Sequence, residues 1–323
     1  MNGSVQSRSE WRGIVTDYLG LMVALGLLIL VFSLSSRHFF SADTFRTIAN
    51  QIPASVLVAT GMTYVLIVAE IDLSVGSVLG LCGAVLGVSL TQWHWPLWAG
   101  LPGAICIGAL CGMFNGFVSV KWRLPSFIVT LAMMEMARGA AHAVTKSQTQ
   151  YIGSSIEGIA GAEIFGLSLP FLLALLAVVV GQIILSRAVF GRYMMAVGAN
   201  PEAARLSGID PRKIKMRVFL ISGLLAGIAA VIDTSRFQSA NPNAGSGFEL
   251  QAIAAAVIGG TSLMGGRGSV VRTFFGVLII AVLNTGLATV GAEDETKRIV
   301  TGAVIIAAVI VDHYRHRLGK KRA

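Results

Sequence analysis

Long runs of apolar residues without a charge limit the possible folds of this chain more than any other feature. The first run, Leu19–Ser36, is long enough as an α-helix to cross the hydrocarbon core of a bilayer. No small-residue cleavage site clearly follows it, so it is predicted to be a membrane span and not a signal peptide. Comparable runs continue to Val311, and only 13% of the residues are charged, against about 25% in soluble domains. We therefore predict an all-α, polytopic bundle of transmembrane helices.

The runs divide the chain into a cytoplasmic N-tail (1–18), a membrane domain (19–311) and a basic cytoplasmic C-tail (312–323). Ten spans are expected. They are Leu19–Ser36, Gln51–Ala69, Val75–Leu90, Ala99–Val120, Pro125–Val144, Leu169–Leu185, Val218–Ile232, Gln251–Leu263, Val270–Val290 and Ile299–Val311. The eighth is too short to cross about 30 Å of hydrocarbon at ~1.5 Å per residue. It is expected to be half a helix that is buried in protein or lines a cavity.

Positive charges predict which side of the membrane each connection occupies. The N-tail, the turn Lys121–Arg123, the loop 188–217 and the C-tail are basic, and basic segments stay on the cytoplasmic side. The intervals between them hold four, two and four spans, so both termini are predicted to be cytoplasmic. The net charge of +9 lies largely in these segments, which gives no reason to expect a nucleic-acid partner.

Glycines at a spacing of four residues indicate close helix packing. Gly108, Gly112 and Gly116 fall on one helix face, and Gly223 and Gly227 do the same in another span. Small residues allow the close backbone contact on which helix association in lipid depends. We expect these faces to pack within the chain, with a dimer contact as the alternative.

A short capped helix is predicted inside the basic loop. Asn200 is a good N-cap and Pro201 suits the first helical position. Gly208 suits the left-handed residue after a helix, and Asp210 with Pro211 repeats the start signal. A helix of two turns is unstable alone, so it is expected to dock on its own protein or on a cytoplasmic partner. The segment consists of Asn200, Pro201, Glu202, Ala203, Ala204, Arg205, Leu206, Ser207 and Gly208.

Few polar side chains interrupt the spans. Glu135 is a candidate functional group because a carboxylate near the bilayer centre is costly, and an ion pair with Arg138 is the alternative. Amides and hydroxyls suit a neutral polyol because they donate and accept without net charge; hydrogen bonds between helices are the alternative. The candidates for a hydrophilic pathway are Asn50, Gln51, Thr63, Asn115, Thr130, Glu135 and Asn284.

Two polar interruptions are predicted to be turns. The stretch Glu70–Ser74 is expected to cap a helix start, with Asp72 or Ser74 as the N-cap. The glycine-rich stretch Gly265–Gly268 lacks the Lys-Ser/Thr ending of a phosphate-binding loop, so we interpret it as a tight turn. No motif for ATP binding, hydrolysis or metal binding occurs elsewhere. We therefore expect neither catalysis by this chain nor a cofactor or metal.

Several motifs resemble those of one transporter family. They are Gly61–Thr63, Ile71–Ser77, Gly191–Arg192 with Ala203–Ile209, and Ala254–Leu263 followed by Gly265–Gly266. In this order they resemble the permease subunits of ribose-type ABC sugar importers, over about Phe39–Asp312. The sugar itself is left open among pentoses, hexoses and polyols.

The resemblance implies an assembly in the bacterial inner membrane. Such permeases work in pairs, usually as a homodimer, with two cytoplasmic ABC ATPase subunits and a periplasmic sugar-binding protein. The segment 200–208 would be the coupling helix that an ATPase engages, and transport would proceed by alternating access. A branched-chain amino-acid-type ABC permease is the nearest alternative. A secondary transporter is less favoured, because no cluster of buried acids accompanies Glu135.

Overall fold

The structure, a computed structural model, describes residues 3–310 apart from 165, 294, 305 and 308–309, with side chains from residue 18 onward. The predicted C-tail, 312–323, lies outside the described residues. The helices are α1 (Gly3–Ser35), α2 (Ala42–Gln51), α3 (Pro53–Ile67), α4 (Val75–Thr91), α5 (Leu97–Trp122), α6 (Ser126–Thr145), η1 (Gly153–Ser155), α7 (Glu157–Ala160), α8 (Leu169–Arg187), α9 (Val189–Ala199), α10 (Pro201–Leu206), α11 (Pro211–Phe237), α12 (Phe248–Ile258) and α13 (Val270–Thr289). The strands are β1 (Gln150–Tyr151), β2 (Glu163–Ile164), β3 (Leu167–Ser168) and β4 (Ser239–Ala240).

The predicted helical bundle is confirmed, but the number of spans is not. Six described helices, α1, α5, α6, α8, α11 and α13, are long and apolar enough to cross a membrane. A seventh results if α2 and α3, which meet at 47°, form one bent span. The helices α4 and α12 are apolar but only 17 and 11 residues long. The described residues of the tenth predicted span are all helical, and residues 305, 308, 309 and 311 within it are not described.

Two helices extend far beyond their predicted bounds. Helix α11 begins at Pro211 and ends at Phe237, whereas the predicted span covered only Val218–Ile232. The polar residues Thr234 and Ser235 continue the helix because their side chains are buried against protein and not exposed to lipid. Helix α1 begins at Gly3, so most of the predicted N-tail is also helical.

Helix α3 lies at the centre of the bundle. All of its residues except Ser55 are buried, and it packs against α8, α11, α12 and α13. Its one aromatic hydroxyl is satisfied inside the protein, because Tyr64 donates a hydrogen bond of 2.6 Å to the carbonyl oxygen of Gly181 in α8. Helix α4 is also buried along nearly its whole length.

The predicted glycine faces pack within the chain. Helices α5 and α11 cross where Gly108 and Gly112 meet Gly223, and a Cβ atom at any of the three would collide with backbone of the facing helix. This close approach is the small-residue packing expected in lipid. The sequence analysis expected these faces to pack within the chain, and that prediction is confirmed for these positions.

A non-helical stretch, residues 68–74, connects α3 to α4 inside the bundle. Its backbone groups find partners on α6: Ile71 N donates to Ser126 Oγ at 3.0 Å and Leu73 N donates to Thr130 Oγ1 at 3.1 Å. Backbone outside helices is tolerated at membrane depth only where protein supplies such partners. The stretch is therefore held in place by side chains of a neighbouring helix.

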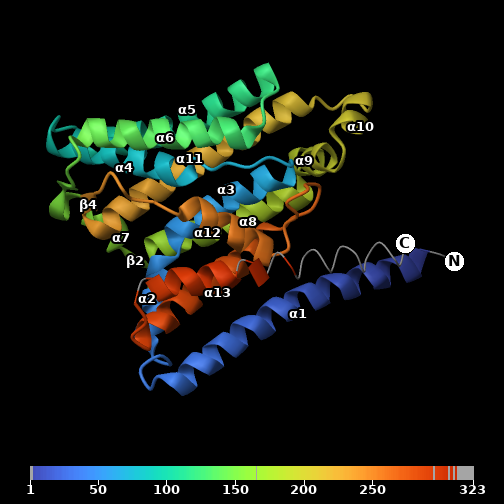
Figure 1. Cartoon of the computed structure of the whole chain (residues 1–323), viewed down its shortest axis with the longest axis horizontal. Coiled ribbons are helices and arrows are strands. Elements are labelled where there is room, and N and C mark those ends of the chain that lie inside the picture. The colour runs from blue at the N-terminus through green and yellow to red at the C-terminus, as the bar shows by residue number, and fades with distance from the viewer. Residues whose placement is uncertain (1–2, 165, 294, 305, 308–309, 311–323) are drawn as a thin grey trace.

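The two ends of the bundle carry different elements. Helices α9 and α10 lie at one end, and α2, α7 and β4 lie at the other (Figure 1). At the second end β1 pairs antiparallel with β4, with Gln150 opposite Ala240, and β2 pairs with β3. These two-residue ladders are small exceptions to the all-α prediction. We call this second end the β4 end.

Candidate functional site

The short helix predicted in the basic loop is present as α10. Asn200 has an extended backbone, and its side-chain oxygen accepts hydrogen bonds of 3.0 Å from the backbone N–H groups of Glu202 and Ala203. Pro201 occupies the first helical position. These bonds satisfy donors that a helix start otherwise leaves free. The predicted N-cap is confirmed.

The end of α10 is closed as the sequence predicted. Ile209 N donates to the carbonyl oxygen of Ala204 at 3.0 Å, and Gly208 between them has φ +83°. Glycine adopts this left-handed conformation at little cost. Asp210 then accepts a hydrogen bond of 3.0 Å from Arg212 N, and Pro211 begins α11. Both ends of α10 are thus fixed by local hydrogen bonds.

One face of α10 rests on the protein and the other is uncovered in this chain. Ala204 is 4% exposed, and the helix contacts α9 and α11. Leu206 is 78% exposed although it is apolar. Glu202 and Arg205 form an exposed ion pair, and the hydrogen bond and charge of Arg205 lower the pKa of Glu202. The predicted docking on its own protein therefore holds for one face only.

Helix α10 is joined to the centre of the bundle on both sides. On the α9 side, Gly198 lies directly against the carbonyl oxygen of Ile67, at the end of α3. That oxygen also accepts a hydrogen bond of 2.8 Å from Gly266 N. On the α11 side, Lys215 forms a half-buried ion pair with Glu70, in the non-helical stretch after α3. Both connections end at the junction between α3 and α4.

The structure does not bring the seven predicted pathway residues together. Three of them form hydrogen bonds between segments. Thr63 and Thr273 share a hydrogen bond of 2.8 Å, Asn115 donates to Ser74 Oγ at 2.9 Å, and Thr130 contacts the stretch before α4. The alternative of bonding between helices is confirmed for Thr63, whereas Asn115 and Thr130 bond to the non-helical stretch 68–74.

Glu135 lies on an exposed face of α6. Within the described part of the chain it forms no ion pair with Arg138. Arg138 instead donates from Nη1 to the carbonyl oxygens of Pro242 and Ala244, at 2.7 and 2.9 Å. The predicted ion pair is therefore not formed, because the loop before α12 supplies uncharged acceptors for the guanidinium group.

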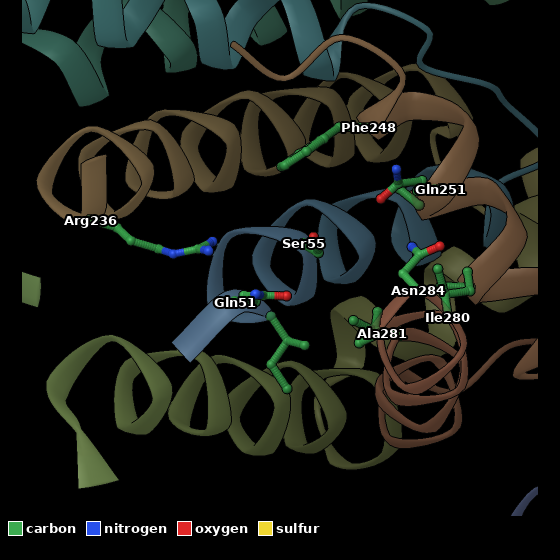
Figure 2. A pocket seen from close by; sticks show the side chains of 12 residues that line it. Gln51, Ser55, Arg236, Phe248, Gln251, Ile280, Ala281 and Asn284 are labelled. Atoms are coloured by element: carbon green, nitrogen blue, oxygen red, sulfur yellow. The ribbon is translucent and has the colours of Figure 1, made fainter. Parts of the chain in front are cut away.

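Two other predicted residues line one cavity of about 310 Å³ near the β4 end (Figure 2). They are Gln51, at the end of α2, and Asn284, in α13. Asn50 is exposed and does not line the cavity. The other lining residues come from α3, α11, α12 and α13, and include Ser55, Arg236, Phe248 and Gln251. Four segments far apart in the sequence therefore meet at this cavity together with α2.

Part of the cavity wall was not predicted from the sequence. Arg236 and Phe248 lie in the polar connection between two predicted spans, and Gln251 is the first residue of a short apolar segment. Residues 233–236 form an uninterrupted polar run after the apolar part of α11. A continuous polar run has no helical periodicity, so the sequence carried no signal that α11 continues to the cavity.

A fully buried carboxylate lies beside the start of α4. Asp72 is 1% exposed; its Oδ1 accepts hydrogen bonds from Ser74 N at 3.0 Å and Ser74 Oγ at 2.6 Å, and its Oδ2 accepts one from Ser222 Oγ at 3.1 Å. Ser74 occupies the predicted N-cap position, but its side chain does not cap the helix. Asp72 thus ties α4 to α11. Among the described residues, no group of three or more His, Cys, Asp or Glu could hold a metal ion.

The helices, the cavity and the capped segment define a polytopic membrane protein with a polar cavity near one end. The chain belongs to the family described as branched-chain amino acid transport system / permease component, which matches residues 44–309. This match covers nearly all of the elements described above from α2 to α13.

Curated relatives cover nearly the whole chain. The ribose import permease protein RbsC of Haemophilus influenzae is 39% identical, over 93% of this chain and 93% of that protein. RbsC of Escherichia coli K12 is 38% identical, over 90% and 92%. The D-allose transport system permease protein AlsC of the same organism is 35% identical, over 92% and 91%. The resemblance to permeases of ribose-type sugar importers is confirmed.

Proposed function

We propose that this chain is the permease subunit of an ATP-driven importer that moves a monosaccharide across the membrane by alternating access. The observation that carries the proposal is the identity of 35–39%, over nine-tenths of the chain, to proteins named for ribose and allose import. The substrate class is a pentose, a hexose or a related polyol. The family description names branched-chain amino acids, but these relatives transport sugars by name.

Separate cytoplasmic ABC ATPase subunits supply the energy in this proposal. The sequence has no phosphate-binding loop of its own. The docking segment would be Asn200–Gly208, because its helix is fixed at both ends and still exposes the apolar side chain of Leu206. A rigid, partly apolar projection is what a partner can hold and displace.

The two connections of α10 suggest how a displacement reaches the membrane. Movement of α10 would act through Gly198 on the end of α3, and through Lys215 on Glu70. Both positions adjoin the non-helical stretch 68–74, which separates two buried helices. ATP binding would favour one of two arrangements of this junction by its differential affinity for them. A role of Asn50, Thr63, Asn115, Thr130 and Glu135 in transport stays a prediction.

The remaining parts of the proposal concern assembly and topology. We propose a second permease subunit, as a homodimer, a periplasmic sugar-binding protein and the bacterial inner membrane as the location. Ten crossings with both termini cytoplasmic would require α12 and the loop after it to cross together. The contact of Gly266 with Ile67 supports this, because it brings that loop back to the end of α3 that adjoins α9.

Reconstitution of the permease with its ATPase and binding protein in liposomes tests the function. We expect uptake of labelled D-ribose, D-allose or L-arabinose that requires ATP and all three components. Uptake of leucine in place of a sugar would favour the amino-acid alternative. Sugar uptake that persists without the ATPase and follows an ion gradient would favour a secondary transporter.

A further inference from the structure

Polar side chains in the membrane part of the chain fall into two groups. Thr63, Asn115 and Thr130 form hydrogen bonds with other segments. By contrast, the side chains of Gln51, Gln251 and Arg236 form no hydrogen bond within the part of the chain that the structure describes, and all three line the same cavity. Gln51 and Arg236 are exposed and Gln251 is half-buried, so their donors and acceptors around one space are open to a bound ligand or to water.

The cavity has the size and lining of a small-molecule site. Its volume of about 310 Å³ falls at the lower end of the range for ligand pockets, roughly 300–1,000 Å³. Figure 2 shows Gln51, Gln251 and Arg236 on different walls around the central space, with Phe248 above it. Asn284 adds an amide whose Oδ1 accepts a hydrogen bond of 3.2 Å from Thr301, which leaves its NH₂ group for a ligand.

The chemistry of these side chains matches hydroxyl groups on a carbon ring. Each amide both donates and accepts, as a hydroxyl does, and the guanidinium group of Arg236 offers several donors in one plane. Phe248 supplies an apolar face against which the C–H groups of a sugar ring can pack. Phe248 lies across the space from Gln51, with Gln251 beside it, so a ring bound there would have an apolar side on Phe248 and a polar side on Gln51 (Figure 2).

We propose that this cavity is a sugar-binding site of the permease itself. Gln51, Gln251 and Arg236 would bind the hydroxyl groups, and Phe248 would pack against the ring. Selection of the substrate would then take place in the membrane as well as in the binding protein. This inference rests on the proposed function of sugar import.

A second cavity adjoins the first. Its volume is about 410 Å³, and it shares Arg236 and Phe248 with the first cavity. Asp233, one helical turn before Arg236, lines it together with Asn241. The guanidinium carbon of Arg236 lies 4.9 Å from the ring centre of Phe237, which holds the side chain at the boundary. Arg236 and Phe248 thus lie in the wall between the two cavities.

Deoxy sugars test the site in the complete reconstituted transporter. Uptake of D-ribose is compared with uptake of 2-, 3- and 5-deoxy-D-ribose, each delivered by saturated binding protein, for the wild type and for Gln251→Leu and Gln51→Leu. Each variant should lower D-ribose uptake roughly tenfold, the value of one hydrogen bond to a hydroxyl. The deoxy sugar that lacks the hydroxyl bound by that glutamine should be affected much less by the same variant.

Gln148→Leu is the matched control, because Gln148 is exposed at the β4 end and lines neither cavity. This control variant should leave the uptake of all four sugars unchanged. If a glutamine variant lowers uptake of all four sugars by the same factor, as a general loss of folded protein would, the inference is overturned. It is also overturned if neither glutamine variant changes uptake. If the wild type takes up no sugar with its partners present, the proposed function fails and the inference fails with it.

Discussion

At the scale of single residues, the tightest positions are glycines where two backbones touch. Gly198 in α9 is the clearest case, since a Cβ atom there would overlap the carbonyl oxygen of Ile67 and collide with Gly266 N. Gly139 in α6 has no neighbour within 4 Å of the same position. The two glycines are both helical, so their comparison separates close packing from helix propensity.

Gly198→Ala should destabilise the protein by about 1–3 kcal/mol, because the neighbouring backbone cannot move aside without opening the junction of α3 and α9. Thermal unfolding in detergent, followed by the loss of folded monodisperse protein, measures the effect. Gly139→Ala should be neutral or slightly stabilising. Equal unfolding temperatures for the two variants would contradict the contact at Ile67.

Gly208 is constrained by its own backbone and not by neighbours. Its φ is +83°, and no other atom lies within 4 Å of the place where a Cβ atom would stand. Gly208→Val should strain the end of α10 by about 1–2 kcal/mol and uncouple ATP hydrolysis from transport, measured as sugar taken up per ATP. Gly208→Asn should be milder because asparagine tolerates this region. Normal transport by the valine variant, with full ATPase stimulation, would refute the docking assignment.

At the scale of elements, helix α11 connects α10 to the junction between α3 and α4. Helix α11 follows α10 after its N-cap residue Asp210, and about one turn further along it Lys215 forms an ion pair with Glu70. The same helix carries Ser222 to Asp72. A single long helix therefore contacts the non-helical stretch twice, once by an ion pair near its start and once by a buried hydrogen bond.

The Glu70–Lys215 pair should matter more than its exposed counterpart Glu202–Arg205, since its side chains are 14% and 22% exposed. Glu70→Gln should cost about 1–3 kcal/mol, between the values for exposed and buried pairs, with a parallel loss of sugar uptake per ATP. Glu202→Gln should have little or no effect on the unfolding temperature, because its pair is open to solvent. The exchange Glu70→Lys with Lys215→Glu should restore part of both losses. If the exchanged pair is no better than Glu70→Gln, the contact does not act as a pair.

At the scale of the whole molecule, the two ends of the bundle should face opposite sides of the membrane. In a background with the three native cysteines replaced by alanine, Leu206→Cys should react with an impermeant thiol reagent only from the cytoplasmic side. Gln148→Cys should react only from the other side. Labelling of both residues from one side would contradict the proposed topology and the docking site for the ATPase.

The order of helices and the form of α10 were predictable because both depend on local chemistry. Apolar runs specify the helices, and Asn200, Pro201 and Gly208 act within one turn of where they stand. The extent of α11 was not predictable from hydropathy, because the buried hydroxyls of Thr234 and Ser235 face other segments and not lipid. The predicted pathway residues also differ in ways that the sequence could not show, because their partners lie in distant segments. Thr63 and Asn115 form hydrogen bonds with such segments, whereas Gln51 and Asn284 line a cavity.

The sequence alone determined that the chain is a helical membrane protein of a sugar-permease type, since hydropathy, caps and motifs act over short stretches. Only the tertiary structure decided that Gln51, Arg236 and Gln251 share one cavity and that Lys215 reaches Glu70. Such contacts join residues that lie far apart in the chain, and their geometry depends on how whole helices cross, which no local pattern specifies.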